Sequence, residues 1–206
     1  SGDCVDVEYL RDGVRYDPAT DTWQPIADAP IGVGQPYGEA NPYPAVAVLD
    51  RTVYLLSTQR LLAYHLDADR WEELPAPPED GQLLATDSVL LAVPWSNEGD
   101  RVTYQSFDPR QATWTSHDVE ETYRPDAVIG SAAVGDQLVI ATTTATGYLW
   151  VGRIDVQADG RPARHVFEES EVPNQRPAAV AVGEQVAWPR EGPLAWFLDP
   201  QRYDWS

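Results

Sequence analysis

Hydrophobic and polar residues alternate along this chain in short runs, separated by turn-forming residues. Val5–Tyr9 alternates apolar and acidic side chains, while Ala45–Leu49 and Gln137–Ile140 are nearly continuous apolar stretches. Such short runs, bounded by Gly, Pro, Asp and Ser, are typical of β-strands. No segment sustains the spacing of an amphipathic helix. The pattern predicts an all-β protein with essentially no helix.

One phrase recurs along the chain. A large apolar residue is followed by an Asp-containing turn and then, seven positions later, by Trp, and a Pro often follows the second strand. The four copies are Tyr16 to Trp23, Tyr64 to Trp71, Phe107 to Trp114 and Leu198 to Trp205, and a fifth, worn copy begins at Ile154, with Val166 or Phe167 in the place of the Trp. Asp and Pro favour turns, so each copy predicts two strands joined by a tight turn, with the aromatic side chains packed in a β core.

Repetition at this spacing is typical of repeat architectures such as propellers. Turn signals such as Asp50-Arg51 and Gly135-Asp136 divide the longer units into four strands. The sequence therefore predicts a β-propeller of four-stranded antiparallel blades in one domain over residues 1–206, with about five blades. The predicted units are 4–29 (incomplete), 45–75, 82–118, 127–169 and 178–205.

The phrase resembles the second half of a kelch repeat, in which a Tyr-Asp-Pro turn precedes Trp and a Pro-containing exit such as Gln24-Pro25-Ile26. The resemblance implies a kelch-like propeller. The paired glycines of that family should follow the second strand of each blade. Their places here hold Ser57-Thr58, Pro94-Trp95, Thr142-Thr143 and Pro189-Arg190, so we expect a divergent kelch-type or related propeller.

An incomplete first blade leaves two arrangements open. The ring closes within this chain, which we favour, or the chain is a fragment of a larger ring. An open ring would leave sheet edges unpaired, so a further chain segment or a subunit could close it. Cys4, the only cysteine, offers no internal disulfide and no Cys-based zinc site.

Charge narrows the range of partners. The formal net charge is −19, and all 14 basic residues are Arg. Phosphate binding relies on basic side chains, so we expect no nucleic-acid partner. No apolar run has the length needed to cross a bilayer, so we expect no membrane insertion. Bacterial kelch-like domains are often exported, and the resemblance therefore implies an extracytoplasmic or secreted location.

Loops at one end of the blades are the expected binding surface. In a four-stranded antiparallel blade, the starts of strands one and three and the ends of strands two and four meet at the same face, and loops on a rigid scaffold commonly carry binding groups. The loop over 30–44, which is rich in Gly, Pro and Tyr, falls on that face. Aromatic and guanidinium groups there could form a cup for a sugar or a peptide carboxylate. The candidate ligand-binding residues are Tyr37, Tyr43, Trp95, Tyr123, Arg124 and Arg190.

Catalytic signals are weaker than binding signals. His65, His117 and His165 fall in separate units near outer strands or turns, so we expect surface histidines and no metal or cofactor. No Ser, His and Asp set carries a nucleophile turn. The sequence therefore favours a non-catalytic binding or assembly module with a protein or glycan partner. The alternatives are a carbohydrate-active enzyme with acidic residues in the central funnel, and a structural subunit of a larger assembly completed in trans.

Overall fold

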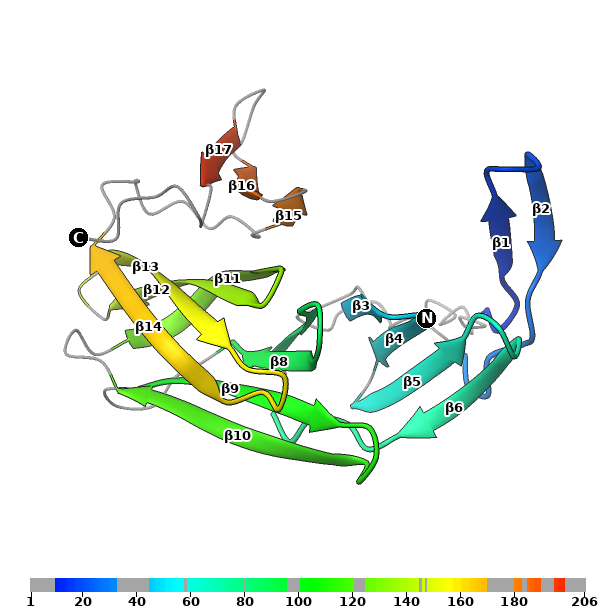
Figure 1. Cartoon of the computed structure of the whole chain (residues 1–206), viewed down its shortest axis with the longest axis horizontal. Coiled ribbons are helices and arrows are strands. Elements are labelled where there is room, and N and C mark those ends of the chain that lie inside the picture. Colours follow the sequence, from blue (N-terminus) through cyan, green and yellow to red (C-terminus); the bar gives the residue numbers. More distant parts are fainter. Residues whose placement is uncertain are drawn as a thin grey trace, which may run out of the picture. The chain divides into compact units, whose positions relative to one another are not determined.

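Every regular element in the described part of the chain is a β-strand (Figure 1). The structure is a computed structural model that describes residues 10–32, 45–57, 59–79, 81–95, 101–120, 125–144, 146 and 148–169, with the backbone of three later strands. The all-β prediction is confirmed.

The strands belong to five antiparallel sheets in which neighbours in sequence pair with each other. The first sheet contains β1 (Val14–Asp17) and β2 (Thr22–Pro25), and the second contains β3 (Ala45–Leu49), β4 (Thr52–Ser57), β5 (Arg60–His65) and β6 (Arg70–Leu74). The third contains β7 (Gly81–Ala85), β8 (Leu90–Pro94), β9 (Arg101–Asp108) and β10 (Thr113–Glu120). The fourth contains β11 (Pro125–Val134), β12 (Gln137–Thr144), β13 (Leu149–Val156) and β14 (Pro162–Glu169). The fifth contains β15 (Val180–Val182), β16 (Gln185–Pro189) and β17 (Ala195–Leu198).

These sheets match the predicted repeat units. Three of them have four strands and fall where the units 45–75, 82–118 and 127–169 were expected. The β1–β2 sheet has two strands in the described residues. The predicted strand over 5–9 lies outside them, so the incomplete first unit stays a prediction. The two-residue turns at Asp50-Arg51 and Gly135-Asp136 join adjacent strands as predicted. Most of the loop over 30–44 lies outside the described residues.

Two compact units make up the chain. One unit is Ser1–Ala76 and the other is Pro77–Ser206. The membership of both in one domain over residues 1–206, and the closure of a ring, stay predictions.

The aromatic residues of the repeated phrase face each other across hairpins. Tyr16 pairs with Trp23, Tyr64 with Trp71, and Phe107 with Trp114 in the strand register. The ring centroids of the three pairs are 4.9, 5.0 and 5.0 Å apart, with tilted planes. Contacts of this geometry stabilise a sheet beyond the area that they bury. Trp205, the last Trp of the phrase, lies outside the described residues.

The worn copy of the phrase differs from its prediction. Ile154 lies opposite His165, whereas Val166 lies opposite Arg153 and Phe167 opposite Gly152. The expectation that Val166 or Phe167 takes the place of the Trp is therefore wrong. The reason is a register shift after Asp155 and a longer turn between β13 and β14.

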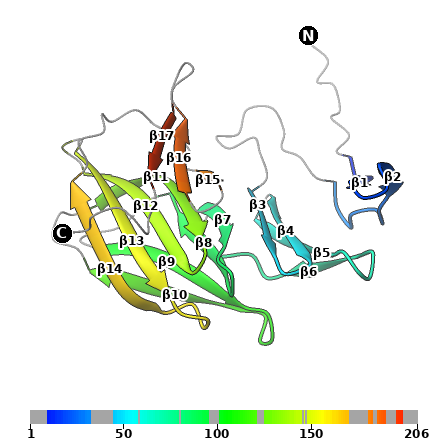
Figure 2. The same cartoon turned by 45° about the horizontal axis from the view of Figure 1, so that its top comes forward.

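A shared core joins the β7–β10 and β11–β14 sheets. Their first strands, β7 and β11, lie near each other, and so do their last strands, β10 and β14 (Figure 2). Fully buried side chains from both sheets fill the space between them, including Leu91, Tyr104, Leu138 and Ile154. Each buried Leu or Ile contributes roughly 1.5–3 kcal/mol by its removal from water. This core fixes the two sheets against each other and thereby positions the turns at their ends.

Candidate functional site

Of the predicted ligand-binding residues, only Trp95 lies in the described part of the chain. It follows β8, is 38% exposed, and its carbonyl accepts a 3.0 Å hydrogen bond from the N–H of Val128 in the next sheet. Tyr37, Tyr43, Tyr123, Arg124 and Arg190 lie outside the described residues. Their assembly into a cup with Trp95 therefore stays a prediction.

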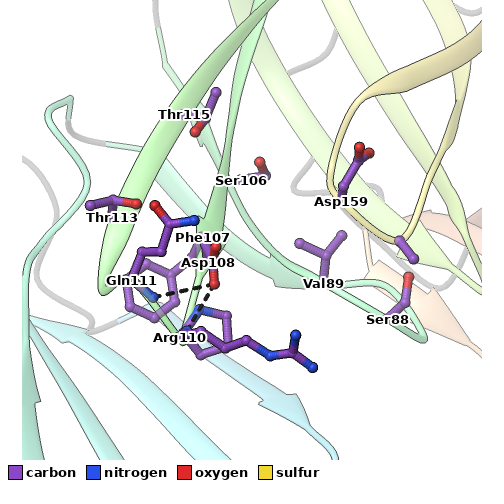
Figure 3. A pocket seen from close by; sticks show the side chains of 12 residues that line it. Ser88, Val89, Ser106, Phe107, Asp108, Arg110, Gln111, Thr113, Thr115 and Asp159 are labelled. Carbon is purple, nitrogen blue, oxygen red and sulfur yellow. Dashed lines mark hydrogen bonds between the residues drawn. The ribbon is translucent and has the colours of Figure 1, made fainter.

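A pocket of about 470 Å³ lies at the other end of the same two sheets. Figure 3 shows its lining side chains, which come from the β9–β10 hairpin on one side and from the β7–β8 loop and the β13–β14 turn on the other. These turns join strand one to strand two, or strand three to strand four. They therefore lie opposite the end that carries Trp95, because consecutive antiparallel strands alternate in direction. The lining residues are Ser88, Val89, Ser106, Phe107, Asp108, Pro109, Arg110, Gln111, Thr113, Thr115, Ala158 and Asp159.

The β9–β10 hairpin forms one wall of the pocket. Asp108 Oδ1 accepts hydrogen bonds from the backbone N–H groups of Arg110 at 2.8 Å and Gln111 at 3.4 Å. This is the Asx-type bonding that favours Asp at the start of a turn. Ala112 closes the turn with a φ of 50°. The bonded turn presents the side chains of Arg110 and Gln111 to solvent at the edge of the pocket.

The β13–β14 turn forms the opposite wall. Asp159 accepts hydrogen bonds from the backbone N–H of Arg161 at 3.1 Å and from its guanidinium Nε at 2.8 Å. These bonds, the backbone one foremost, lower the pKa of Asp159 below its usual value. Asp159 is therefore ionised at neutral pH, and its charge is paired with the Arg161 guanidinium of the same turn.

The back of the pocket is built by a close approach between the two sheets. Gly160 has a φ of +86°, and a Cβ at this position would lie 2.1 Å from the Cβ of Ser106. Only glycine combines a favourable positive φ with the absence of a Cβ, so Gly160 allows the turn to pack directly against β9. The Gly160 carbonyl also accepts a 2.8 Å hydrogen bond from the hydroxyl of Tyr104, whose pKa is raised by burial.

His117 supports this back wall from β10. Its Nε2 lies 2.8 Å from Ser106 Oγ, and its ring stacks on Tyr104 with centroids 5.0 Å apart. Burial, the largest cause, lowers the pKa of His117, so the ring is neutral at pH 7. Of the three histidines predicted at the surface, His165 is exposed, whereas His117 and His65 are half-buried.

Several polar groups of the pocket remain available to a ligand. The side chains of Arg110, Gln111, Thr113 and Thr115 make no hydrogen bond to any other residue that the structure describes. Together they offer guanidinium and amide donors, an amide acceptor and two hydroxyls. Val89 and Pro109 add apolar surface. In the described ranges, no group of three His, Cys, Asp or Glu residues is placed to hold a metal ion, and no helix is long and apolar enough to cross a membrane.

Sequence reasoning missed this pocket because its residues carry ordinary turn signals. Asp108-Pro109 belongs to the repeated phrase, which indicates a structural turn. Gly160 is the one available signal, since a glycine that follows Ala158-Asp159 in a long turn can permit close backbone approach. Its contact partner on another sheet is visible only in the folded chain.

Comparison with solved structures identifies the fold. The chain superposes on hydrazine synthase from Kuenenia stuttgartiensis with a TM-score of 0.50 and 15% identity, covering 86% of this chain and 49% of that one. It superposes on apo AztD from Citrobacter koseri with a TM-score of 0.52 and 14% identity, covering 80% of this chain and 47% of that one. Both are β-propellers, and the chain therefore has a β-propeller fold, as predicted.

The chain spans about half the length of these two solved chains. No protein-family model matches the sequence, and no curated protein sequence matches it. The kelch-like character of the repeat stays a prediction.

Proposed function

We propose that this chain is a non-catalytic binding module that holds its partner through the loops at the ends of its blades. The observation that carries this proposal is the pocket between the β9–β10 hairpin and the β13–β14 turn. Its volume of about 470 Å³ lies in the range of small-ligand sites. The shared core of the two sheets holds its walls in place, so a ligand would meet a preformed site and little ordering free energy would be lost on binding.

The chemistry of the free groups favours a glycan as the partner. Thr113 and Thr115 can each donate and accept, as can the amide of Gln111, and this mixture complements sugar hydroxyls. Val89 and Pro109 can contact the C–H face of a sugar ring. The net charge of −19 favours a neutral sugar over an acidic one.

The state of the carboxylates favours binding over acid catalysis. A glycosidase needs one carboxylic acid whose pKa is raised so that it can protonate the leaving group. In the pocket, Asp159 has a lowered pKa and Asp108 already accepts two backbone hydrogen bonds. Both groups are arranged as turn-stabilising acceptors.

A protein partner is the second candidate, and the end of the blades that carries Trp95 is the proposed surface for it. Trp95 is partly exposed there, and the aromatic and Arg rim of Tyr37, Tyr43, Tyr123, Arg124 and Arg190 belongs to the same proposal. An Arg124→Ala/Arg190→Ala double variant tests this rim. If this variant binds a captured protein partner with unchanged affinity, the proposal that the rim binds that partner is wrong.

Glycan binding at the pocket is tested on an array of neutral and uronic-acid oligosaccharides. The full chain is compared with an Arg110→Ala/Thr113→Ala variant, and the matched control is Arg164→Ala/Ala163→Ser on the exposed part of β14. The proposal predicts binding to neutral glycans that falls by about tenfold or more in the pocket variant, because two ligand hydrogen bonds are lost. The control should bind normally. Absence of binding to every glycan, or equal binding by both variants, would overturn the glycan assignment.

A further inference from the structure

The β3–β6 sheet contains a small clamp that holds both backbone groups of one residue. The N–H of Ala27 donates to Asp69 Oδ1 at 3.0 Å, and the carbonyl of Ala27 accepts from the Trp71 indole Nε1 at 2.8 Å. Ala27 belongs to the segment that leaves β2. Asp69 and Trp71 lie at the turn and start of the β5–β6 hairpin, so the clamp fastens the exit of one blade onto the next.

A network within the hairpin orients the clamp. The hydroxyl of Tyr64 donates to Asp69 Oδ1 at 2.6 Å, and the rings of Tyr64 and Trp71 are in contact. Asp69 itself has a φ of 44°, a conformation that Asp tolerates better than most residues. The clamp therefore needs a Tyr, an Asp five positions later and a Trp two positions after the Asp.

The β1–β2 hairpin contains the same parts in the same arrangement. Tyr16 donates to Asp21 Oδ1 at 2.7 Å, Asp21 has a φ of 51°, and the rings of Tyr16 and Trp23 lie 4.9 Å apart. Asp21 and Trp23 thus correspond to Asp69 and Trp71 in sequence spacing, backbone conformation and hydrogen bonding.

The two clamps differ in what covers them. Tyr64 is 3% exposed, whereas Tyr16 is 44% exposed and Trp23 is 66% exposed. The Trp23 indole N–H makes no hydrogen bond with any residue that the structure describes. Tyr16 and Trp23 are in contact, so they form one exposed aromatic surface, and contiguous exposed apolar surface can mark an interaction site.

We propose that Asp21 and Trp23 form a docking site for the exit segment of a further propeller blade. The carboxylate of Asp21 accepts a backbone N–H of that segment, and the Trp23 indole donates to the carbonyl of the same residue, as Asp69 and Trp71 do with Ala27. The interface is independent of the glycan pocket, which lies on other sheets.

The occupied clamp defines the chemistry of the segment. Ala27 is preceded by Pro25 and Ile26 and followed by Asp28 and the buried Ala29. Ile26 also donates its N–H to the Gly13 carbonyl at 3.1 Å, so the segment runs extended beside its own blade. The occupant of the Asp21–Trp23 site is therefore an extended segment with a small residue at the clamped position and a branched aliphatic residue before it.

The test uses a capped peptide with the sequence of residues 24–29, Gln-Pro-Ile-Ala-Asp-Ala, and the full ¹⁵N-labelled chain. The indole N–H resonance of Trp23 is assigned from the Trp23→Phe variant and followed during titration by NMR, which detects weak complexes. A six-residue peptide making two directed hydrogen bonds should bind with a Kd of roughly 1 mM. The Trp23 indole resonance should move downfield as the new hydrogen bond forms, and the Trp71 indole, already occupied, should not move.

Two variants distinguish binding at the clamp from nonspecific association of the peptide. Asp21→Ala removes the carboxylate and should lower the affinity for the peptide by roughly tenfold. Thr22→Ala changes the other face of β2 and should bind the peptide as tightly as the unmodified chain does. No shift of Trp23 at saturating peptide, or equal binding by Asp21→Ala, would overturn the proposal. Self-association that is lost in Trp23→Phe and occurs without peptide would also overturn it, by identifying a second copy as the occupant.

Discussion

The hydroxyl of Tyr64 donates a hydrogen bond of 2.6 Å to the carboxylate of Asp69, five residues later, at the turn of the β5–β6 hairpin. The first hairpin repeats this bond, but the β9–β10 hairpin has Phe107 and Ala112 at the same two positions. Donor and acceptor are therefore present together or absent together. The backbone at all three turn positions is left-handed, with φ between 44° and 51°, so the turn geometry does not depend on the bond.

Removal of the Tyr64 hydroxyl should destabilise the chain. Burial first, and then the bond to Asp69, raise the pKa of Tyr64 to about 12, so the hydroxyl is protonated and donates at neutral pH. Tyr64→Phe should cost about 1.5–3 kcal/mol, the range for a hydrogen bond to a charged group. Urea unfolding measures the effect. In an Asp69→Ala background the same change should cost much less, and an equal cost in both backgrounds would refute the coupling.

The left-handed alanine of the β9–β10 turn is expected to limit stability. Ala112 has a φ of 50°, where a Cβ is unfavourable by roughly 1–2 kcal/mol. Ala112→Gly should therefore raise the free energy of unfolding by about 0.5 kcal/mol, after the added entropy of glycine in the unfolded chain is subtracted. Ala163→Gly, at an exposed position of β14, is the control and should destabilise. A loss of stability in both variants would contradict this interpretation of the turn.

Two glycines with positive φ should respond differently to alanine. Gly135 has a φ of +57°, and a Cβ added there would lie 3.8 Å from its nearest atom, which is an ordinary van der Waals contact. Gly160 has a φ of +86°, and an added Cβ would lie 2.1 Å from Ser106. Gly135→Ala should cost roughly 1 kcal/mol from backbone strain. Gly160→Ala should cost about 2–4 kcal/mol, because overpacking adds to the strain. Denaturant midpoints of the two variants give the comparison, and equal losses would show that Gly160 does not hold the back of the pocket.

His117 should make stability depend on pH. Its folded pKa lies below the value of an unfolded histidine, about 6.5, so the folded chain binds fewer protons. Its contribution is fully present above pH 6.5 and is lost as the pH falls through the folded pKa. Unfolding by urea at pH 7.5 and pH 5 should show a smaller drop in stability for His117→Gln than for the unmodified chain. An equal drop would assign the pH dependence to groups other than His117.

Much of the fold could be predicted because the repeat encodes it locally. The distance from Tyr16 to Trp23 reflects a fixed turn length between paired strands, and this spacing located three hairpins in correct register. The spacing does not give the register at Ile154. The β13–β14 turn is longer there, and spacing alone could not identify His165 as the residue opposite.

The pocket could not be predicted because contacts between sheets create it. Ser106 and Gly160 are 54 positions apart in the sequence and belong to different sheets. Neither residue type indicates a ligand site by itself. The predicted site lies instead at the end that carries Trp95, because the loops assigned to that end are rich in aromatic and Arg residues.

The location of glycan binding tests the central claim most directly. Two side-chain signals report on the two ends of the blades, namely the Gln111 amide at the pocket and the Trp95 indole at the opposite end. The neutral oligosaccharide bound most strongly on the array is titrated into the ¹⁵N-labelled chain, and both signals are followed by NMR. The account predicts that the Gln111 signal shifts with saturation while the Trp95 signal stays in place. A shift of Trp95 with an unperturbed Gln111 would contradict it and move the binding site to the other end of the blades.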